Sequence, residues 1–320
     1  MNRYSLRSIF HTRGVALISV MLLLAFLVTI IAYMLESQYL VIRQTSLQSV
    51  NESAYLENSY VESWAIASLT KEALDGKSIK ESYQIDFLDE FWSQEGLSKD
   101  VGGLRLESQV TDLQGRFNVN NLEGGKTGQW YLIFNRLLQA LDIPPTITDA
   151  IVDWIDSDQN PAGINGAEDQ TYMSEVPARR AANQRMRSVE ELLLVKGVTP
   201  EIYKVLLPHV TVIDKNDLKI NVNTATLPVL QALLTNPGSA ESFLGQRQSG
   251  FDSVEEIIQL PEFAGTGTSL QPIIDVKSNY FELKVTTASE KNKKTYFSGI
   301  QREVIDDKLE FTFIYRKRST

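Results

Sequence analysis

The feature that most constrains this chain is an uncharged, strongly apolar run near its N-terminus, from Val15 to Leu35. Folded as an α-helix, this run would be roughly 31 Å long at about 1.5 Å per residue. That length matches the hydrocarbon core of a bilayer, which is about 30 Å thick. The run therefore predicts a single membrane-spanning helix.

Charges on either side of the run predict its orientation. Arg3, Arg7 and Arg13 precede it without any acidic residue, and Glu36 follows it. Because positively charged flanks stay in the cytoplasm, we expect a single-pass inner-membrane protein with a cytoplasmic N-terminus and a periplasmic C-terminal part. About 285 residues follow the run, which is enough for two domains.

The short basic segment 1–14 has the features of a leader that is removed. A secretory signal has an apolar region of about 7–15 residues followed by a small-residue cleavage site, and no such site follows this run. The small residue, Gly14, instead stands before it. Cleavage after Gly14 would leave the apolar helix as the mature N-terminus, beginning at Val15. The alternative is an uncleaved signal-anchor helix in which Gly14 has no role.

Composition disfavours most enzyme classes. The chain contains no cysteine, which excludes disulfides and cysteine zinc sites, and its two histidines, His11 and His209, form no zinc motif. It has no phosphate-binding loop or nucleophile elbow. A hydrolase using the acid pair Asp156 and Glu168 remains as an alternative, although no other residue marks a substrate cleft. We therefore expect a protein that is not an enzyme.

The apolar helix is expected to continue beyond the membrane. Residues 36–74 contain no proline or glycine, their apolar residues recur at near-helical spacing, and Gly76 is the first stop signal. These features predict one helix over 15–75. The alternative is two helices broken near Ser53.

Strand patterns lie at both ends of the remaining chain. Alternation of apolar and polar residues predicts strands at 104–110, 280–287, 294–300 and 309–315, the last three as an antiparallel meander. Residues 120–277 have helical patterns instead. We therefore predict an α+β fold, with a long N-terminal helix packed on an antiparallel sheet and a large α-helical domain, 120–277, inserted between the sheet segments 76–119 and 278–320.

The predicted insert contains an internal repeat. Ser188-Val-Glu-Glu-Leu-Leu recurs as Ser253-Val-Glu-Glu-Ile-Ile, and residues 220–225, Ile-Asn-Val-Asn-Thr-Ala, form a common lead-in to DNA-binding helix-hairpin-helix modules. The hairpins match those modules poorly, because the first has the single glycine Gly197 and the second places Glu262 where a phosphate would bind. Residues 120–277 carry 12 Lys+Arg against 20 Asp+Glu, a net charge of −8. We therefore expect these hairpins to serve packing or protein contacts rather than nucleic-acid binding. A local basic patch is left open, formed by Arg179, Arg180, Arg185 and Arg187.

An acidic loop follows a predicted amphipathic helix at 148–155. Asp156, Asp158 and Asn160 match the first three ligand positions of a calcium-binding EF-hand loop, but Pro161 then replaces its turn glycine. The oxygen-rich sequence predicts an irregular Ca²⁺ site rather than Mg²⁺, which demands tighter geometry. The predicted ligands are Asp156, Asp158, Glu168 and Asp169, with Asn183 as a further donor. The alternative is a solvated acidic loop without an ion.

Several segments, taken in order, resemble one family. They are RGVALISVMLLL, TDLQGRFNVNNL, IVDWIDSDQNPAGINGAED, RSVEELLLVKGVTPEIYKVLLPHVTV and INVNTA. Together they look like the minor pseudopilin K family of type II secretion systems. The resemblance implies cleavage after Gly14 and N-methylation of Val15 by a prepilin peptidase, and calcium in the inserted domain. It also implies a tip complex with minor pseudopilins I, J and H, above the major pseudopilin and the inner-membrane secretion platform.

The fifth residue after the implied cleavage is Ser19, where most pilins have a glutamate that meets a neighbouring subunit's amine. Members of the K family also lack that acid. A buried carboxylate is costly in a membrane unless a cation pairs with it, and a subunit at the top of a filament has no neighbour above to supply one. The predicted function is therefore a pseudopilus tip subunit that initiates assembly and supports protein export, with direct contact to cargo left open. The alternative is a minor pilin of a type IV pilus or competence system, or a membrane-anchored DNA-binding protein.

Overall fold

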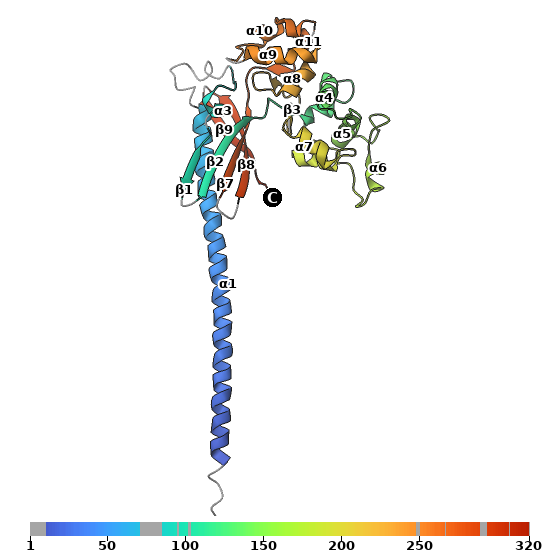
Figure 1. Ribbon diagram of the computed structural model, residues 1–320. Coiled ribbons are helices and arrows are strands. Elements are labelled where there is room, and N and C mark those ends of the chain that lie inside the picture. The colour runs from blue at the N-terminus through green and yellow to red at the C-terminus, as the bar shows by residue number, and fades with distance from the viewer. Residues whose placement is uncertain are drawn as a thin grey trace, which may run out of the picture. The chain divides into compact units, whose positions relative to one another are not determined.

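The computed structural model describes residues 11–70, 85–94, 96–101, 104–247, 250–265, 267–288, 293–306 and 308–319 (Figure 1). Side chains of residues 11–15, 43–58, 101 and 104 are also outside the description. The chain divides into two compact units, Met1–Tyr60 and Val61–Thr320. Most of the predicted leader and the predicted helix end at Gly76 lie outside the described residues, and the predicted domain boundaries stay a prediction.

One continuous helix, α1, runs from His11 to Thr70. It passes through Ser53 without interruption, so the alternative of two helices is wrong. Its continuity follows from the sequence, which has no proline or glycine between Val15 and Thr70 to remove a backbone hydrogen bond or loosen the chain. Within α1, residues Ala16–Ile42 are long and apolar enough to cross a membrane.

The last turns of α1 pack on a five-stranded antiparallel sheet, as predicted. The strands are ordered β1 (Ser98–Val101), β2 (Leu104–Asp112), β7 (Tyr280–Ala288), β8 (Lys293–Ile305) and β9 (Lys308–Arg318). Val61, Ala65 and Leu69 recur every four residues and face one side of the sheet. They join a buried core with Leu106, Val110, Trp92 of α3 (Phe91–Gln94), Phe281, Leu283, Val285 and Ile300.

A polar contact also fastens α1 to the sheet. Glu62, which is buried on α1, accepts hydrogen bonds from the guanidinium of Arg316 at 2.8 and 3.1 Å. The hydroxyl of Ser298 donates to the same carboxylate at 2.8 Å. Because a buried carboxylate without partners would be costly, these donors make Glu62 compatible with the interface.

A large insert separates the neighbouring strands β2 and β7. Its helical elements are η2 (Val119–Gly124), α4 (Gln129–Ala140), α5 (Ile147–Ile155), α6 (Asp169–Met173), η3 (Val189–Leu194), α7 (Pro200–Leu206), α8 (Leu227–Leu233), η4 (Pro237–Ser239), α9 (Ala240–Gln246), α10 (Val254–Ile258), η6 (Pro261–Phe263) and α11 (Gly267–Leu270). The insert also contains four short strands that the helical prediction missed. They are β3 (Phe117–Asn118), parallel to β4 (Val210–Thr211), and β5 (Ile220–Asn221), parallel to β6 (Ile274–Asp275).

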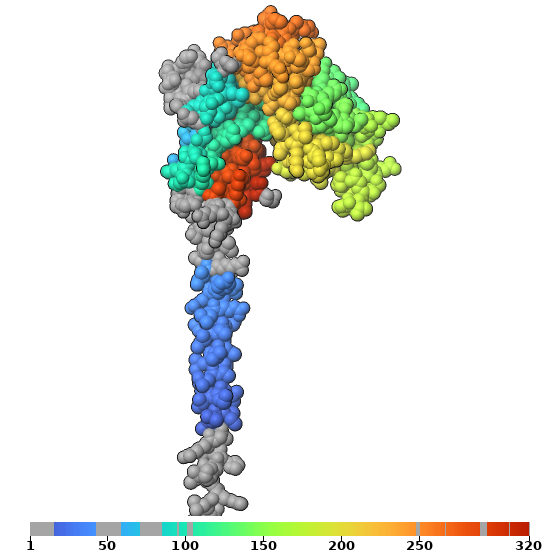
Figure 2. Space-filling model, viewed as in Figure 1, coloured from blue at the N-terminus to red at the C-terminus, as the bar shows by residue number. Residues whose placement is uncertain are grey.

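The insert consists of two modules that follow the same plan. The first module runs from β3 to β4, and the second from β5 to β6; each begins with a strand, continues through helices and ends with a strand parallel to the first. The first module, green to yellow in Figure 2, adjoins the orange second module, and α4 packs against α8. One continuous apolar core serves both modules.

Equivalent asparagines close the two modules in the same way. Asn120 accepts from the backbone N–H of Met186 at 2.9 Å and donates to its carbonyl oxygen at 3.0 Å. Asn223 makes the same two bonds with Phe251, at 2.9 and 3.0 Å. Met186 and Phe251 each lie two residues before the repeated serine, so the sequence repeat marks a structural repeat.

The lead-in at residues 220–225 also packs against the sheet. Asn221 donates to Asp112 at the end of β2, to the Ser278 hydroxyl and to the Asp86 carbonyl, at 2.9–3.2 Å. Burial raises the pKa of Asp112 to about 6, although the hydroxyls of Ser278 and Thr224 donate to it. This motif, which resembled a DNA-binding lead-in, thus forms a buried polar network between the insert and the sheet.

Candidate metal centre

The acidic loop begins where α5 ends. All nine residues of α5, Ile147–Ile155, are buried, because its apolar residues enter the core of the insert. Asp156 follows in an extended conformation and caps the helix. The helix therefore leads the chain out of the core directly into the acidic sequence.

Two acids on α5 lie beneath the loop, four residues apart on one helix face. Asp149 pairs with Lys126 at 2.9 Å and accepts from the Tyr131 hydroxyl at 2.7 Å. Asp153 is 0 % exposed and accepts from the backbone N–H groups of Ala162 at 2.7 Å and Ala167 at 2.5 Å. Burial raises the pKa of Asp153, and the negative charge of Asp149 adds to that effect.

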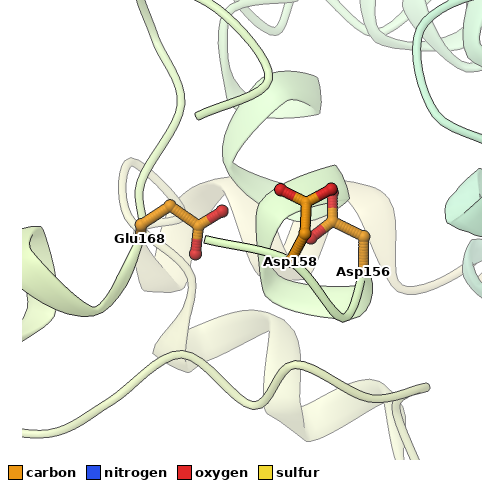
Figure 3. A group of neighbouring side chains, drawn as sticks. All are labelled: Asp156, Asp158 and Glu168. Atoms are coloured by element: carbon orange, nitrogen blue, oxygen red, sulfur yellow. The ribbon is translucent and has the colours of Figure 1, made fainter. Parts of the chain in front are cut away.

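The structure brings three of the predicted ligands together. Carboxylate oxygens of Asp156, Asp158 and Glu168 all lie within 4.8 Å of one another (Figure 3). Asp158 is exposed, whereas Glu168 is buried. These acids are up to twelve positions apart in the sequence. Only the fold of the loop brings them together.

Several oxygens around this cluster are buried without a hydrogen-bond donor among the described residues. They are Oδ1 of Asp156, both carboxylate oxygens of Glu168, and Oδ1 of Asn183. Buried oxygens normally accept at least one hydrogen bond, and a buried oxygen without a donor lowers the stability of the folded state. Asn183 has a positive φ of 48°, a backbone conformation that asparagine tolerates better than most residues.

The electrostatics of the cluster favour a cation. Burial, followed by repulsion from Asp153, Asp156 and other acids, raises the pKa of Glu168 to about 7. Burial, followed by repulsion from Asp158 and Asp153, raises the pKa of Asp156 to about 6. Clustered hard oxygen donors without protein partners fit a Ca²⁺ ion, which takes six to eight oxygens in flexible geometry.

Asp169, the other predicted carboxylate ligand, makes different contacts. Its Oδ1 accepts from the backbone N–H of Ala181 at 3.0 Å, and its Oδ2 lies 3.7 Å from Nε of Arg180. It is not part of the three-carboxylate group. Its role as a ligand, like that of Asn183, stays a prediction.

Two of the four arginines of the predicted basic patch, Arg179 and Arg185, make contacts within the insert. Arg179 pairs with Glu175 at 2.7 Å and donates to the Leu194 carbonyl at 2.9 Å. Arg185 contacts Glu123 and Asp214, each at 3.0 Å. Because acids within the same chain neutralise these two arginines, they favour packing over phosphate binding.

The predicted processing residues lie in helix α1. Gly14 and Val15 are on its backbone, and their side chains are outside the description. Ser19 is exposed on the apolar part of the helix.

Two family models match the insert. Both describe protein K of the type II secretion system, one over residues 115–215 and the other over residues 220–277. The first range covers the first module with its acidic loop, and the second range covers the second module. The family is thus recognised separately in each half of the insert.

Relatives named type II secretion system protein K are similar over most of their length. The protein from Pseudomonas aeruginosa is 33 % identical over 300 residues, which cover 90 % of this chain and 88 % of the relative. The protein from Pectobacterium carotovorum subsp. carotovorum is 32 % identical over 299 residues, covering 85 % and 87 %. The chain belongs to the type II secretion system protein K family.

A solved structure has the same fold. A chain of the crystal structure of the GspK-GspI-GspJ complex from enterotoxigenic Escherichia coli aligns with a TM-score of 0.75 and 23 % identity. The alignment covers 87 % of this chain and 99 % of that chain. It confirms the predicted α+β architecture for this member of the protein K family.

Sequence analysis did not anticipate the roles of Asp153, Asn120 and Asn223. All three are buried and bond to backbone groups distant in sequence. The repeated Asn-Val-Asn of residues 118–120 and 221–223 was the available signal for the two asparagines. For Asp153, the signal was an acid in the last turn of a largely apolar helix, just before a loop rich in oxygen ligands.

Proposed function

We propose that this protein is a minor pseudopilin at the tip of the type II secretion pseudopilus, where it initiates or caps assembly and supports protein export without catalysis. The observation that carries the proposal is similarity to protein K relatives over most of the chain, together with the apolar helix α1 that leads into the sheet. The helix would anchor the protein in the inner membrane, with the insert in the periplasm.

The tip position is supported by Ser19 and by the insert. A serine at position 19, within the apolar part of α1, avoids the cost of placing a carboxylate in the membrane without a cation partner. The insert follows β2 and returns to β7, and it adds a second core to the sheet. Such bulk would obstruct regular packing along a shaft but fits at an end. The partners we propose are minor pseudopilins I, J and H; the related crystal structure is a complex of GspK with GspI and GspJ.

Mass spectrometry of the native membrane form tests the assembly route. We expect the mature chain to begin at N-methylated Val15, after cleavage following Gly14 by the prepilin peptidase. Gly14→Leu should leave the leader in place, whereas Ser19→Ala should be processed normally. A chain that begins at Met1 or beyond the apolar run would contradict the proposal. Co-purification of the processed protein with pseudopilins I and J tests its place in the tip complex.

We further propose that the acidic loop binds Ca²⁺. Asp156, Asp158 and Glu168 would hold the ion, with Asn183 and Asp169 as the other predicted donors, and the ion would neutralise a loop that otherwise repels itself. The unpartnered buried oxygens of Asp156 and Glu168 support this proposal. Calorimetric titration of the full chain in detergent should show calcium binding that the variant Asp156→Asn/Glu168→Gln abolishes; absence of binding to the natural sequence would contradict it.

A further inference from the structure

Two kinds of acid surround the candidate metal centre, and hydrogen bonding separates them. Oxygens of Asp156 and Glu168 are buried without a donor among the described residues. Asp153 is more deeply buried, yet both of its oxygens accept backbone N–H groups from the loop, at Ala162 and Ala167. The unpartnered oxygens of Asp156 and Glu168 can therefore bind a cation, whereas both oxygens of Asp153 already accept hydrogen bonds from the loop backbone.

We infer that Asp153 is a positioning residue for the calcium site rather than one of its ligands. Its bond to the Ala167 N–H fixes the backbone immediately before Glu168. Its bond to the Ala162 N–H fixes the middle of the same loop. Together these bonds close the loop that starts at Asp156, so that Glu168 returns to Asp156 and Asp158. This inference rests on the proposed calcium binding.

The two hydrogen bonds of Asp153 would favour calcium binding by lowering its entropic cost. A loop that must be ordered when the ion arrives loses conformational freedom at that moment, and this loss weakens binding. A loop already closed by Asp153 presents its ligands in place. Groups that orient metal ligands from behind typically change metal affinity by about 10–100-fold when they are removed.

Gly166 shows how closely the loop is fitted to Asp153. A Cβ atom at Gly166 would collide with Oδ2 of Asp153, and it would lie 2.9 Å from the backbone nitrogen of Ala162. Any larger residue must therefore displace either the carboxylate or the loop backbone that it binds. The glycine allows the close approach on which both hydrogen bonds depend.

Asp149 provides a matched control on the same helix face. It is also a buried acid, but it bonds to Lys126 and Tyr131 and makes no described bond to a loop amide. Asp149→Asn removes one negative charge close to the site, as Asp153→Asn does. Only Asp153→Asn also directs an amide NH₂ group at a backbone N–H donor, which it cannot accept. Comparison of the two variants separates positioning from charge.

The experiment uses the full chain in detergent, with Ca²⁺ for affinity and Eu³⁺ as a luminescent probe of the site. Luminescence lifetimes in H₂O and D₂O report the number of waters on bound Eu³⁺. We expect Asp153→Asn to lower calcium affinity about 10–100-fold and to add about one or more waters, since protein oxygens no longer converge. Asp149→Asn should lower affinity less than Asp153→Asn does and leave the water number unchanged, because Asp149 bonds to Lys126 and Tyr131 rather than to a described loop amide.

Gly166→Ala should reproduce the effect of Asp153→Asn on affinity and water number while it keeps every charge. It provides a second test if Asp153→Asn does not fold, and melting curves in chelator show whether each variant is folded. If Asp153→Asn matches Asp149→Asn in both affinity and water number, Asp153 does not position the ligands and the inference is wrong. If the natural sequence binds neither Ca²⁺ nor Eu³⁺, the calcium proposal itself fails, and the inference fails with it.

Discussion

The two modules of the insert share a frame but differ in one connection. In the first module, residues 156–188 join α5 to η3 and contain the acidic cluster. In the second, residues 247–253 make the equivalent connection between α9 and α10. In both modules one asparagine bonds to the backbone N–H and carbonyl of a single residue, Asn120 to Met186 and Asn223 to Phe251. This asparagine bridge lies just before η3 in the first module and just before α10 in the second. The bridge therefore belongs to the shared frame, and the candidate metal centre belongs to a long connection that the second module lacks.

This difference shows how a repeated unit can gain a site without changing its core. The shared apolar core and the asparagine bridges hold the ends of each connection in place. A longer connection can then be inserted between fixed ends at small entropic cost, because loop closure depends weakly on length. Five predictions test this comparison.

The largest expected effect tests whether the asparagine bridges are equivalent. Asn120→Ala and Asn223→Ala each leave a buried N–H and a buried carbonyl without a partner, which should cost about 3 kcal/mol of unfolding free energy. For a unit of this size that corresponds to a melting temperature lower by about 6–12 °C. Thermal unfolding of the full chain measures it, with the exposed Asn216→Ala as control. Destabilisation by only one of the two variants would break the proposed equivalence.

Removal of calcium should affect only the first module. Saturation at about 100 times the dissociation constant stabilises a site by about 2.7 kcal/mol, so chelation should lower the melting temperature by about 5–10 °C. Hydrogen exchange should locate the loss of protection in residues 156–188 and not in the second module. An unchanged melting temperature, or loosening centred on the second module, would contradict the assignment.

The pH dependence of the ion-free protein should identify the same module. The pKa values of Glu168 and Asp156, about 7 and 6, exceed those of an unfolded chain, which are about 4. Their contribution to stability is therefore fully present below about pH 4 and is lost as pH rises through 6 and 7. In chelator, acidification from pH 7.5 to 5.5 should raise the melting temperature relative to Asp156→Asn/Glu168→Gln.

Calcium binding should depend on pH in the opposite sense to the stability of the ion-free protein. Protons compete with the ion for Asp156 and Glu168, so calcium affinity should fall as the pH is lowered from 7.5 to 5.5. Calorimetric titration at the two pH values measures this change. Affinity that is constant or rises on acidification would show that these carboxylates do not hold the ion.

The smallest expected effect concerns the contact between the first module and the sheet. Lys317 on β9 pairs with Glu190 of η3 at 2.9 Å, and the two side chains are 38 % and 51 % exposed. Such exposed pairs contribute less than about 1 kcal/mol, so Lys317→Ala should hardly change the melting temperature. Glu62→Gln, which weakens the contact of a buried carboxylate with Arg316 and Ser298, serves as the comparison and should cost more unfolding free energy. A large loss from Lys317→Ala would indicate that the pair fixes the first module on the sheet.

Much of the fold followed from local sequence. The absence of proline and glycine predicted α1, and alternating residues predicted β2, β7, β8 and β9, all of which the structure contains. The short strands β3 to β6 were missed because two residues cannot show a period. Their existence depends on pairing between segments distant in the sequence, such as Phe117 with Val210.

The candidate site was only partly predictable. The oxygen-rich sequence pointed to the loop, and Asp156, Asp158 and Glu168 do converge there. Asp169 was predicted as a ligand from the same oxygen-rich sequence; its contacts are to Ala181 and Arg180, and its role as a ligand stays a prediction. Adjacent side chains leave the backbone in different directions, so the sequence alone does not fix which acids of the loop converge.

Local sequence is enough to specify the apolar helix, the alternating strands, the repeat and the concentration of acids in one loop, because each depends on residues close together along the chain. The folded chain was needed to show which asparagines close the modules and which acids keep oxygens without a donor among the described residues. The reason is that hydrogen bonding in a buried region depends on donors from distant segments: Met186 reaches Asn120, and the loop amide of Ala167 reaches Asp153.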